Sequence, residues 1–200
     1  MPARRLLIAS NNLDKVDELR LLLGDCGWEI VAPSELGLRV DAEETGATYA
    51  ENARIKAEAF MRASGLPSLA DDSGLEVDAL NGEPGALHHL NGWDGRDQAE
   101  RIQILLEAMK DVPEGLRTAR FRAVIVVAMP GGTELLEEGV LEGEITRAPS
   151  GESGFGYDPV MLMPEMGKTV AELSVGEKNA ISHRGRAAAK MTRRLRGMAG

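Results

Sequence analysis

The order of strand-like and helix-like segments is the feature that most constrains the fold of this chain. Short apolar runs at 6–9 and 29–32 alternate with segments of helical spacing near the start. Further along, strand-like runs follow one another, and the strongest is 119–129, with a β-branched run at 124–127. Alternation followed by grouping is typical of an α/β protein with a mixed, twisted sheet and flanking helices.

Capping signals predict where helices begin and end. Thr48 and Glu51 form a Thr-x-x-Glu capping box, and Ser174 and Glu177 form a second one. Gly65 supplies a helix stop. The expected helices cover 13 to Gly24 or Gly27, 48–64, 96–112 and 174–195. The expected strands cover 6–9, 29–32, 66–70, 119–129, one or two within 133–146, and 160–163.

Composition limits the kind of molecule. The chain has 200 residues, 43% of them hydrophobic, which can fill the core of one domain, 1–200, compact or two-lobed. A net charge of −9 disfavours a nucleic-acid partner, because binding a polynucleotide needs many Lys and Arg side chains. No apolar run approaches the ~18 residues of a membrane span. The one cysteine, Cys26, suits a reducing cytoplasm. We therefore expect a small-molecule site.

The first polar cluster lies between the first strand and the first helix. It reads Ser10-Asn11-Asn12-Leu13-Asp14-Lys15. A helix N-terminus presents unpaired backbone N–H groups and the positive end of the helix dipole, and both attract phosphate. Ser10 or Asn12 is expected to cap the helix, and Lys15 adds a full positive charge. The alternative is an ordinary cap with a solvated lysine.

The second cluster is acidic. Glu43 and Glu44 precede the capped helix, and Asp71 and Asp72 are expected to follow the short strand 66–70. Mg²⁺ takes oxygen ligands and commonly uses one or two carboxylates together with substrate phosphates. Two carboxylates from separate loops can hold such an ion, and another can orient a water. The alternative is surface decoration, which suits the glutamates better than the aspartates.

The third cluster is rich in glycine and aromatic residues. Three glycines and two aromatic residues lie within 151–157, in a chain that is only 4% aromatic. Glycine lets the backbone approach a ligand closely, and an aromatic ring can stack on a base. The same segment also fits a tight turn with its ring in the core.

The fourth cluster carries three cationic or imidazole side chains near the start of the last helix. At ~100° per residue, with Lys178 at zero, His183 falls near ~140° and Arg184 near ~240° on a helical wheel. One straight helix would not direct all three at one ligand. We therefore predict a break near Ser182, which is a suitable N-cap for a restart. The alternative is a solvated basic face with a surface histidine.

These motifs, taken in this order, resemble the inosine triphosphate pyrophosphatase family of the Ham1 type, whose members act on aberrant purine nucleoside triphosphates. The resemblance covers 6–195 and is specific as a set, although each motif alone is weak. Its matching segments are 9–15, Glu-Glu-Thr-Gly at 43–46, 51–57, Ala-Asp-Asp-Ser-Gly-Leu at 70–75, Gly-Phe-Gly-Tyr-Asp-Pro at 154–159, 171–173, 177–178 and Ile-Ser-His-Arg-Gly at 181–185.

The resemblance implies two lobes around a central groove, a homodimer and a Mg²⁺-dependent reaction. In that reaction, water attacks at the α-phosphate side, and the products are pyrophosphate and a nucleoside monophosphate. It implies that Asp72 is the base for the water, that Glu44 and Asp72 serve the metal, and that Lys15 is catalytic, while the sequence leaves Asp71 as an alternative base. The implied substrate contacts are Ser10, Asn11, Asn12, Leu13, Asp14, Lys15, Ser73, Phe155, Gly156, Tyr157, Asp158, Lys178, His183 and Arg184.

A donor-only pocket agrees with the implied substrates. Inosine and xanthosine carry an acceptor oxygen at position 6, where adenine carries an amino donor. Donors such as Lys178, His183 and Arg184 would pair with the oxygen and lose their partner with adenine, and such sites can discriminate by ~10⁴–10⁵.

One segment departs from the family pattern. After Pro84-Gly85 the family usually has Ser-Ala-Arg followed by an aromatic residue, whereas this chain reads Ala-Leu-His-His-Leu-Asn-Gly-Trp at 86–93. The arginine is absent, so the shape of one wall of the groove is expected to differ from that in the family.

There are three alternatives to this family assignment: a Maf-type nucleotide pyrophosphatase, a non-catalytic nucleotide sensor, and a nucleic-acid binder. The segments at 154–158 and 182–184 oppose the first alternative, the intact aspartates the second and the net charge the third.

Overall fold

The structure is a computed structural model that describes residues 4–87, 92–93 and 97–199, without the side chains of Asp14 and Ala199. Its helices are α1 (Leu13–Leu23), α2 (Tyr49–Ser64), α3 (Gln98–Ala108), α4 (Val175–Ile181) and α5 (His183–Ala199). Its strands are β1 (Arg5–Ile8), β2 (Glu29–Val31), β3 (Ser68–Val77), β4 (Thr118–Ala128), β5 (Glu134–Ile145), β6 (Met161–Met163) and β7 (Lys168–Thr169). Short 3-10 helices cover Pro33–Leu36, Asp78–Leu80, Asp158–Val160 and Val170–Glu172.

The strands form one sheet in the order β2-β1-β3-β4-β5-β6-β7. Strand β1 pairs in parallel with β2 and with β3, whereas β6 pairs antiparallel with β5 and with β7. The sheet is therefore mixed, which confirms the fold class that the sequence predicts. The parallel part coincides with the stretch of alternating strands and helices, because parallel neighbours need a crossover connection.

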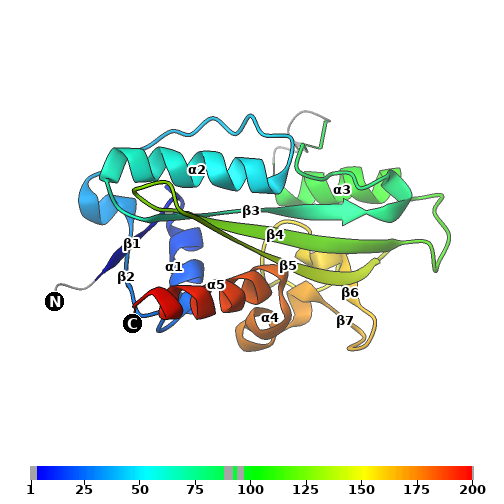
Figure 1. Cartoon of the computed structure of the whole chain (residues 1–200). Helices are drawn as coiled ribbons and strands as arrows, with labels where there is room; N and C mark the ends of the chain where they lie inside the picture. The colour runs from blue at the N-terminus through cyan, green and yellow to red at the C-terminus, as the bar shows by residue number, and fades with distance from the viewer. Residues whose placement is uncertain (1–3, 88–91, 94–96, 200) are drawn as a thin grey trace. The chain divides into compact units, whose positions relative to one another are not determined.

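The chain divides into two compact units, and the four boundaries fall inside β3, β4 and β5 and after the first residue of α5. The first unit comprises 1–72, 123–139 and 184–200, and the second comprises 73–122 and 140–183. In the first unit, α2 covers one face of the sheet, and α1 and α5 lie on the other (Figure 1). Its core contains Leu6, Val16, Leu19, Ile125, Met191 and Leu195.

The second unit has a core of its own. This core contains Val77, Ile102, Leu105, Phe121, Leu141 and Val160. Alternate residues of β4 and β5 enter these two cores. In β4, this alternation explains the apolar pattern of 119–129. Val124 to Val127 are all buried, so this strand is covered on both of its faces.

The predicted helix signals are confirmed. Both capping boxes are formed, and Gly65 ends α2 in the left-handed conformation with φ 70°. The predicted break is also present, because α4 ends at Ile181 and α5 begins at His183. Ser182 between them has extended backbone, with φ −61° and ψ 154°.

One expectation about the strands was wrong. Asp71 and Asp72 do not follow a strand but lie inside β3, which runs on to Val77. The sequence suggested a loop because Asp-Asp-Ser-Gly is poor in strand formers, but pairing with neighbouring strands overrides that weak preference. The segment 133–146 forms one strand, β5, which agrees with the one or two strands expected there. The short strand β7 was not predicted, and α3 is shorter than expected, since it covers Gln98–Ala108.

The segment before α2 is tied to that helix at close range. The Asn52 side chain accepts a hydrogen bond from the Gly46 N–H at 2.8 Å. A Cβ atom added to Gly46 would lie 2.6 Å from the Glu51 Cβ, so only glycine fits there. This contact holds the segment 40–44 near the start of α2.

None of the helices in the described part of the chain has the length and apolar character needed to cross a membrane.

The Thr48 cap is expected to contribute measurably to stability. Its side chain accepts from the Glu51 N–H, and Glu51 in turn accepts from the Thr48 N–H. Replacing Thr48 with alanine removes this partner, and we expect a loss of about 1 kcal/mol in the free energy of unfolding. Urea unfolding measures the loss, and Thr133→Ala, at an exposed turn position, is the control. Equal stabilities would show that the cap is not needed.

Candidate active site

The start of α1 forms the predicted polar cluster. The Asn12 Oδ1 atom accepts from the Lys15 N–H at 3.4 Å, and the Ser10 Oγ atom accepts from the Asn12 N–H at 3.2 Å. Asn12 is therefore the helix cap, one of the two residues that the sequence proposed. The Asn11 side chain donates to the Val40 carbonyl at 2.8 Å and links this turn to the segment 40–44.

Asp71 and Asp72 contact different helices. Asp71 contacts Lys15 of α1 and Arg184 of α5, whereas Asp72 contacts Lys56 of α2. Successive side chains of a strand point to opposite faces of the sheet, and α2 covers the face opposite to α1 and α5 (Figure 1). The strand therefore gives two neighbouring carboxylates separate environments.

Asp71 is a buried, permanently charged group. Its Oδ1 atom lies 3.2 Å from the Lys15 ammonium, and its Oδ2 atom accepts from the Arg184 Nε at 2.9 Å. Burial alone would raise the pKa of Asp71, but the charges of Lys15 and Arg184 outweigh it and hold that pKa far below its ordinary value. Such a carboxylate is a poor proton acceptor.

Asp72 has the opposite tendency. Burial raises the pKa of Asp72, the Lys56 ammonium lowers it, and the nearby Glu44 carboxylate raises it, with a net increase. The Lys56 ammonium lies 3.1 Å from the Asp72 Oδ1 and 2.9 Å from the Glu44 Oε2. Because one ammonium contacts both oxygens, the two carboxylates lie close enough to share a cation. Asp72 is the better proton acceptor of the two aspartates.

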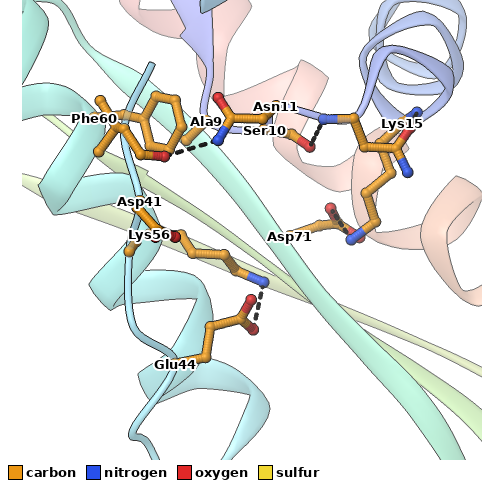
Figure 2. Close-up of a pocket in the computed structure, with 12 residues that line it drawn as sticks. Ala9, Ser10, Asn11, Lys15, Asp41, Glu44, Lys56, Phe60 and Asp71 are labelled. Atoms are coloured by element: carbon orange, nitrogen blue, oxygen red, sulfur yellow. Dashed lines mark hydrogen bonds and ion pairs between the residues drawn. The ribbon is translucent and has the colours of Figure 1, made fainter.

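A pocket of about 320 Å³ lies in the first unit, beside the start of α1. Its lining comes from three places: the turn 9–12 with Lys15, the segment 40–42 with Glu44, and the inward side chains Lys56, Phe60 and Asp71. Figure 2 shows the Lys15 and Lys56 side chains, each paired with an acidic group at this pocket. Two lysines and a helix N-terminus make it suited to a polyanion.

The pocket brings together much of the predicted set. Of the residues predicted to bind phosphate or metal, it is lined by Ser10, Asn11, Asn12, Lys15 and Glu44. Leu13 is exposed, and the side chain of Asp14 lies outside the described part of the chain. Within the described residues, no group of three His, Cys, Asp or Glu side chains is placed to hold a metal. The predicted metal ligands, Glu44 and Asp72, therefore form a pair of carboxylates with no third side-chain ligand among the described residues.

A second polar cluster lies in the second unit. The buried Asp158 carboxylate accepts from the Lys178 ammonium at 2.7 Å and from the Phe155 N–H at 2.9 Å. The Lys178 ammonium also lies 4.6 Å from the centre of the Phe155 ring. A Cβ atom at Gly154, where φ is +81°, would collide with the Asp158 carboxylate. The glycine therefore lets the loop close around this charge.

The two aromatic residues of this loop have different environments. The Phe155 ring is half exposed, whereas Tyr157 packs against the second core. The structure thus separates the two alternatives left by the sequence, since one ring is available to a ligand and the other is largely a packing residue. Gly156 between them has a left-handed φ of 63°.

The restart at Ser182 sends His183 and Arg184 to different units. The His183 ring stacks on Phe121 in the second unit, with centroids 5.0 Å apart and planes at 25°. Arg184 belongs to the first unit, where its guanidinium bonds Asp71 and, at 2.7 Å, Glu18. Neither residue is on a solvated basic face, because both are buried.

Lys56 is the site residue to which the sequence analysis gave no role. It lies within the matching segment 51–57, on the face of α2 that also carries the buried Ala53 and Phe60. A lysine on an apolar helical stripe is a signal for a buried charge partner, since lysine is rarely buried unless it is paired. Ser73 lies on β3, directly after Asp72, and is partly buried.

Residues 88–91, which are half of the departing segment 86–93 and include His88 and His89, lie outside the described part of the chain. The structure therefore does not test the expectation about that wall of the groove.

The fold and the pocket define an α/β protein in which two lysines and the start of α1 line a pocket close to the adjacent aspartates of β3. The family model described as the Ham1 family matches residues 6–194, and the chain belongs to this family. A protein of Symbiobacterium thermophilum named dITP/XTP pyrophosphatase is 48% identical over 198 residues, which cover 98% of this chain and 96% of that protein.

Two solved structures agree with this assignment. A HAM1 protein from Coxiella burnetii has a TM-score of 0.87 and 42% identity, with 96% of this chain and 98% of that chain covered. The Staphylococcus aureus Ham1 protein has a TM-score of 0.86 and 37% identity, with 98% of this chain and 100% of that chain covered. The family that the sequence motifs indicate is confirmed.

Replacement by asparagine is expected to affect stability differently at the two adjacent aspartates. Asp71→Asn removes the buried one of the two carboxylates that Arg184 contacts, and also the carboxylate that faces Lys15, so we expect a loss of about 3 kcal/mol in unfolding free energy. The raised pKa of Asp72 means that folding disfavours its ionised form relative to the unfolded chain, so removal of this charge in Asp72→Asn should cause no loss of stability. Urea unfolding at neutral pH with a chelator measures both.

The pH dependence follows from the lowered pKa of Asp71. A carboxyl group with a lowered pKa stabilises the fold above its unfolded pKa, and this contribution is lost as the pH falls through the folded value. The difference between the unaltered protein and Asp71→Asn should therefore be constant above about pH 5 and shrink below about pH 4. A difference that grows in acid would contradict the assignment.

Proposed function

We propose that this chain is a Mg²⁺-dependent nucleoside-triphosphate pyrophosphatase that hydrolyses ITP, dITP and XTP to the monophosphate and pyrophosphate. Membership of the Ham1 family and the names of its relatives support the hydrolysis of aberrant purine triphosphates. The observation that carries the proposal is the pocket in which Lys15, Lys56 and Glu44 meet beside the start of α1.

The phosphates are assigned to the start of α1 and to the two lysines. Asn12 satisfies the Lys15 N–H, and the remaining N–H groups of the first turn can donate to phosphate oxygens. The ammonium groups of Lys15 and Lys56 supply full positive charge in a protein whose net charge is −9. Because Asp41, Glu44 and Asp71 also line the pocket, the two lysines do not give it a net positive charge, and triphosphate binding would depend on the divalent cation as well.

The metal is assigned to Glu44 and Asp72. Their fit rests on their donor chemistry and on the fact that the Lys56 ammonium contacts both carboxylates. A hard divalent cation takes such oxygens as ligands and fills its remaining positions with water and phosphate oxygens. When bound, Mg²⁺ would neutralise charge on the phosphates and lower the pKa of a coordinated water.

Asp72 is assigned as the base for the attacking water. A base needs a pKa high enough to accept a proton, and the pKa of Asp72 is raised whereas that of Asp71 is held far down by Lys15 and Arg184. Asp71 instead holds the Lys15 ammonium at the pocket. Division of labour between two adjacent carboxylates therefore follows from their environments.

The base of the nucleotide is assigned to Phe155 and Lys178. The half-exposed ring offers a stacking surface, and the ammonium beside it is a donor for the oxygen at position 6 of hypoxanthine or xanthine. Adenine presents a donor at that position and would leave the ammonium without an acceptor. We assign Arg184 to the charge network of Asp71, and its predicted direct contact with substrate stays a prediction.

We further propose that the enzyme works as a homodimer in the cytoplasm and cleanses the nucleotide pool there. The family resemblance supports the dimer, and sedimentation equilibrium of the purified chain tests it.

The first test is pyrophosphate release from ITP, XTP, ATP and GTP with Mg²⁺. We expect rapid turnover of the first two and little of the others. Asp72→Asn removes the proton acceptor and should lower kcat by ~10² or more. Asp111→Asn makes the same chemical change at an exposed position and should have no effect. No turnover of any triphosphate by the unaltered protein would favour a nucleotide sensor instead.

Selectivity is expected to depend on Lys178. Lys178→Met removes the donor next to Phe155, so the ratio of kcat/KM for ITP to that for ATP should fall by roughly tenfold or more. Lys168→Met, at an exposed lysine of β7, is the control and should leave the ratio unchanged. An unchanged ratio in Lys178→Met would mean that other groups read position 6.

A further inference from the structure

Four charged side chains of the first unit form a continuous chain that starts at the pocket. Lys15 lies 3.2 Å from Asp71, Asp71 lies 2.9 Å from Arg184, and Arg184 lies 2.7 Å from Glu18. Lys15 lines the pocket, whereas Glu18 does not. The chain of contacts therefore connects a pocket cation to a carboxylate outside the pocket.

The middle of this chain is buried. The Asp71 and Arg184 side chains are each 2% exposed, and that of Glu18 is 21% exposed. Burial lowers the pKa of Arg184, but Asp71 and Glu18 outweigh it and raise that pKa, so the guanidinium stays charged. A buried guanidinium between two carboxylates divides its hydrogen bonds between them.

The division leaves one oxygen of Asp71 for Lys15. Arg184 uses its Nε for the Asp71 Oδ2 and its Nη1 for the Glu18 Oε2, while the Asp71 Oδ1 faces the Lys15 ammonium. A guanidinium without Glu18 can instead pair with both oxygens of Asp71, which is the usual arrangement of Arg with a carboxylate. The Lys15 ammonium would then lose its anchor.

Lys15 and Glu18 are three residues apart on α1, so they lie on the same face of that helix. The same helix thus supplies the cation at the pocket and the carboxylate that occupies the far side of Arg184. A shift of either group relative to Asp71 changes the position of the other.

We propose that Glu18 is a positioning residue for phosphate binding, which acts through Arg184 and Asp71 to hold the Lys15 ammonium at the pocket. This inference rests on the proposed role of Lys15 in binding the triphosphate. Glu18 touches no reacting group, and its contribution is to substrate binding rather than to proton transfer.

The sign of the effect separates positioning from bulk electrostatics. Removing a negative charge near a phosphate site strengthens anion binding if only the overall field matters. Loss of the Lys15 anchor weakens it. Glu18→Gln removes the charge at nearly constant shape, Glu18→Asp keeps the charge but shortens the reach, and Asp17→Asn makes the same charge change next to Glu18, at an exposed position.

The experiment measures calorimetric binding of inorganic tripolyphosphate, together with kcat and KM for ITP. We expect Glu18→Gln to weaken tripolyphosphate binding and raise KM by roughly tenfold, with kcat changed by less than about twofold. Glu18→Asp should act in the same direction with an unfolding temperature close to that of the unaltered protein. Asp17→Asn should bind tripolyphosphate as tightly as the unaltered protein or more tightly.

A double-mutant cycle with Lys15→Met completes the test. If Glu18 acts through Lys15, Glu18→Gln should weaken binding by less than about twofold in the Lys15→Met background. Additive losses, or unchanged binding in both Glu18 variants, would overturn the inference. Lys15→Met alone must weaken binding, and if it does not, the proposed role of Lys15 fails rather than the linkage to Glu18.

Discussion

The ion pair between Asp71 and Arg184 is the interaction on which the site in the first unit depends. A buried charge is stable only with a partner of opposite sign and good hydrogen-bond geometry, and here each charge has two partners. The pair joins the central strand β3 to the first turn of α5 and, through Lys15, to α1. The polar groups of the pocket therefore take their positions from a contact in the protein interior.

The alternation of side chains along β3 gives the adjacent Asp71 and Asp72 different surroundings. Asp71 faces cations on α1 and α5 and remains ionised, whereas Asp72 faces Lys56 on α2 and the Glu44 carboxylate, with a raised pKa. A loop would not impose this separation, because its side chains have no fixed alternation. The strand gives one carboxylate to structure and leaves the next for the proposed chemistry.

Local signals in the sequence predicted the structure most accurately. The capping boxes at Thr48 and Ser174 and the break at Ser182 each depend on hydrogen bonds within a few residues, so the residue types alone specify them. The end of the strand before Asp71 was misjudged, because β3 is also hydrogen-bonded to β4, which lies far away in the sequence. Lys56 received no role for the same reason, since its partners come from two other segments.

The amino-acid sequence by itself determined the mixed α/β fold, the family and several of the polar residues that line the pocket, although not Lys56. Motif order and short-range spacing are properties of the sequence, so they can be identified without knowledge of the tertiary contacts. Only the tertiary structure decided which of two adjacent aspartates is held by cations, that Arg184 pairs with Asp71 and Glu18, and that Phe155 rather than Tyr157 is exposed. Protonation and exposure depend on neighbours brought together by folding, and the order of residues does not specify those neighbours.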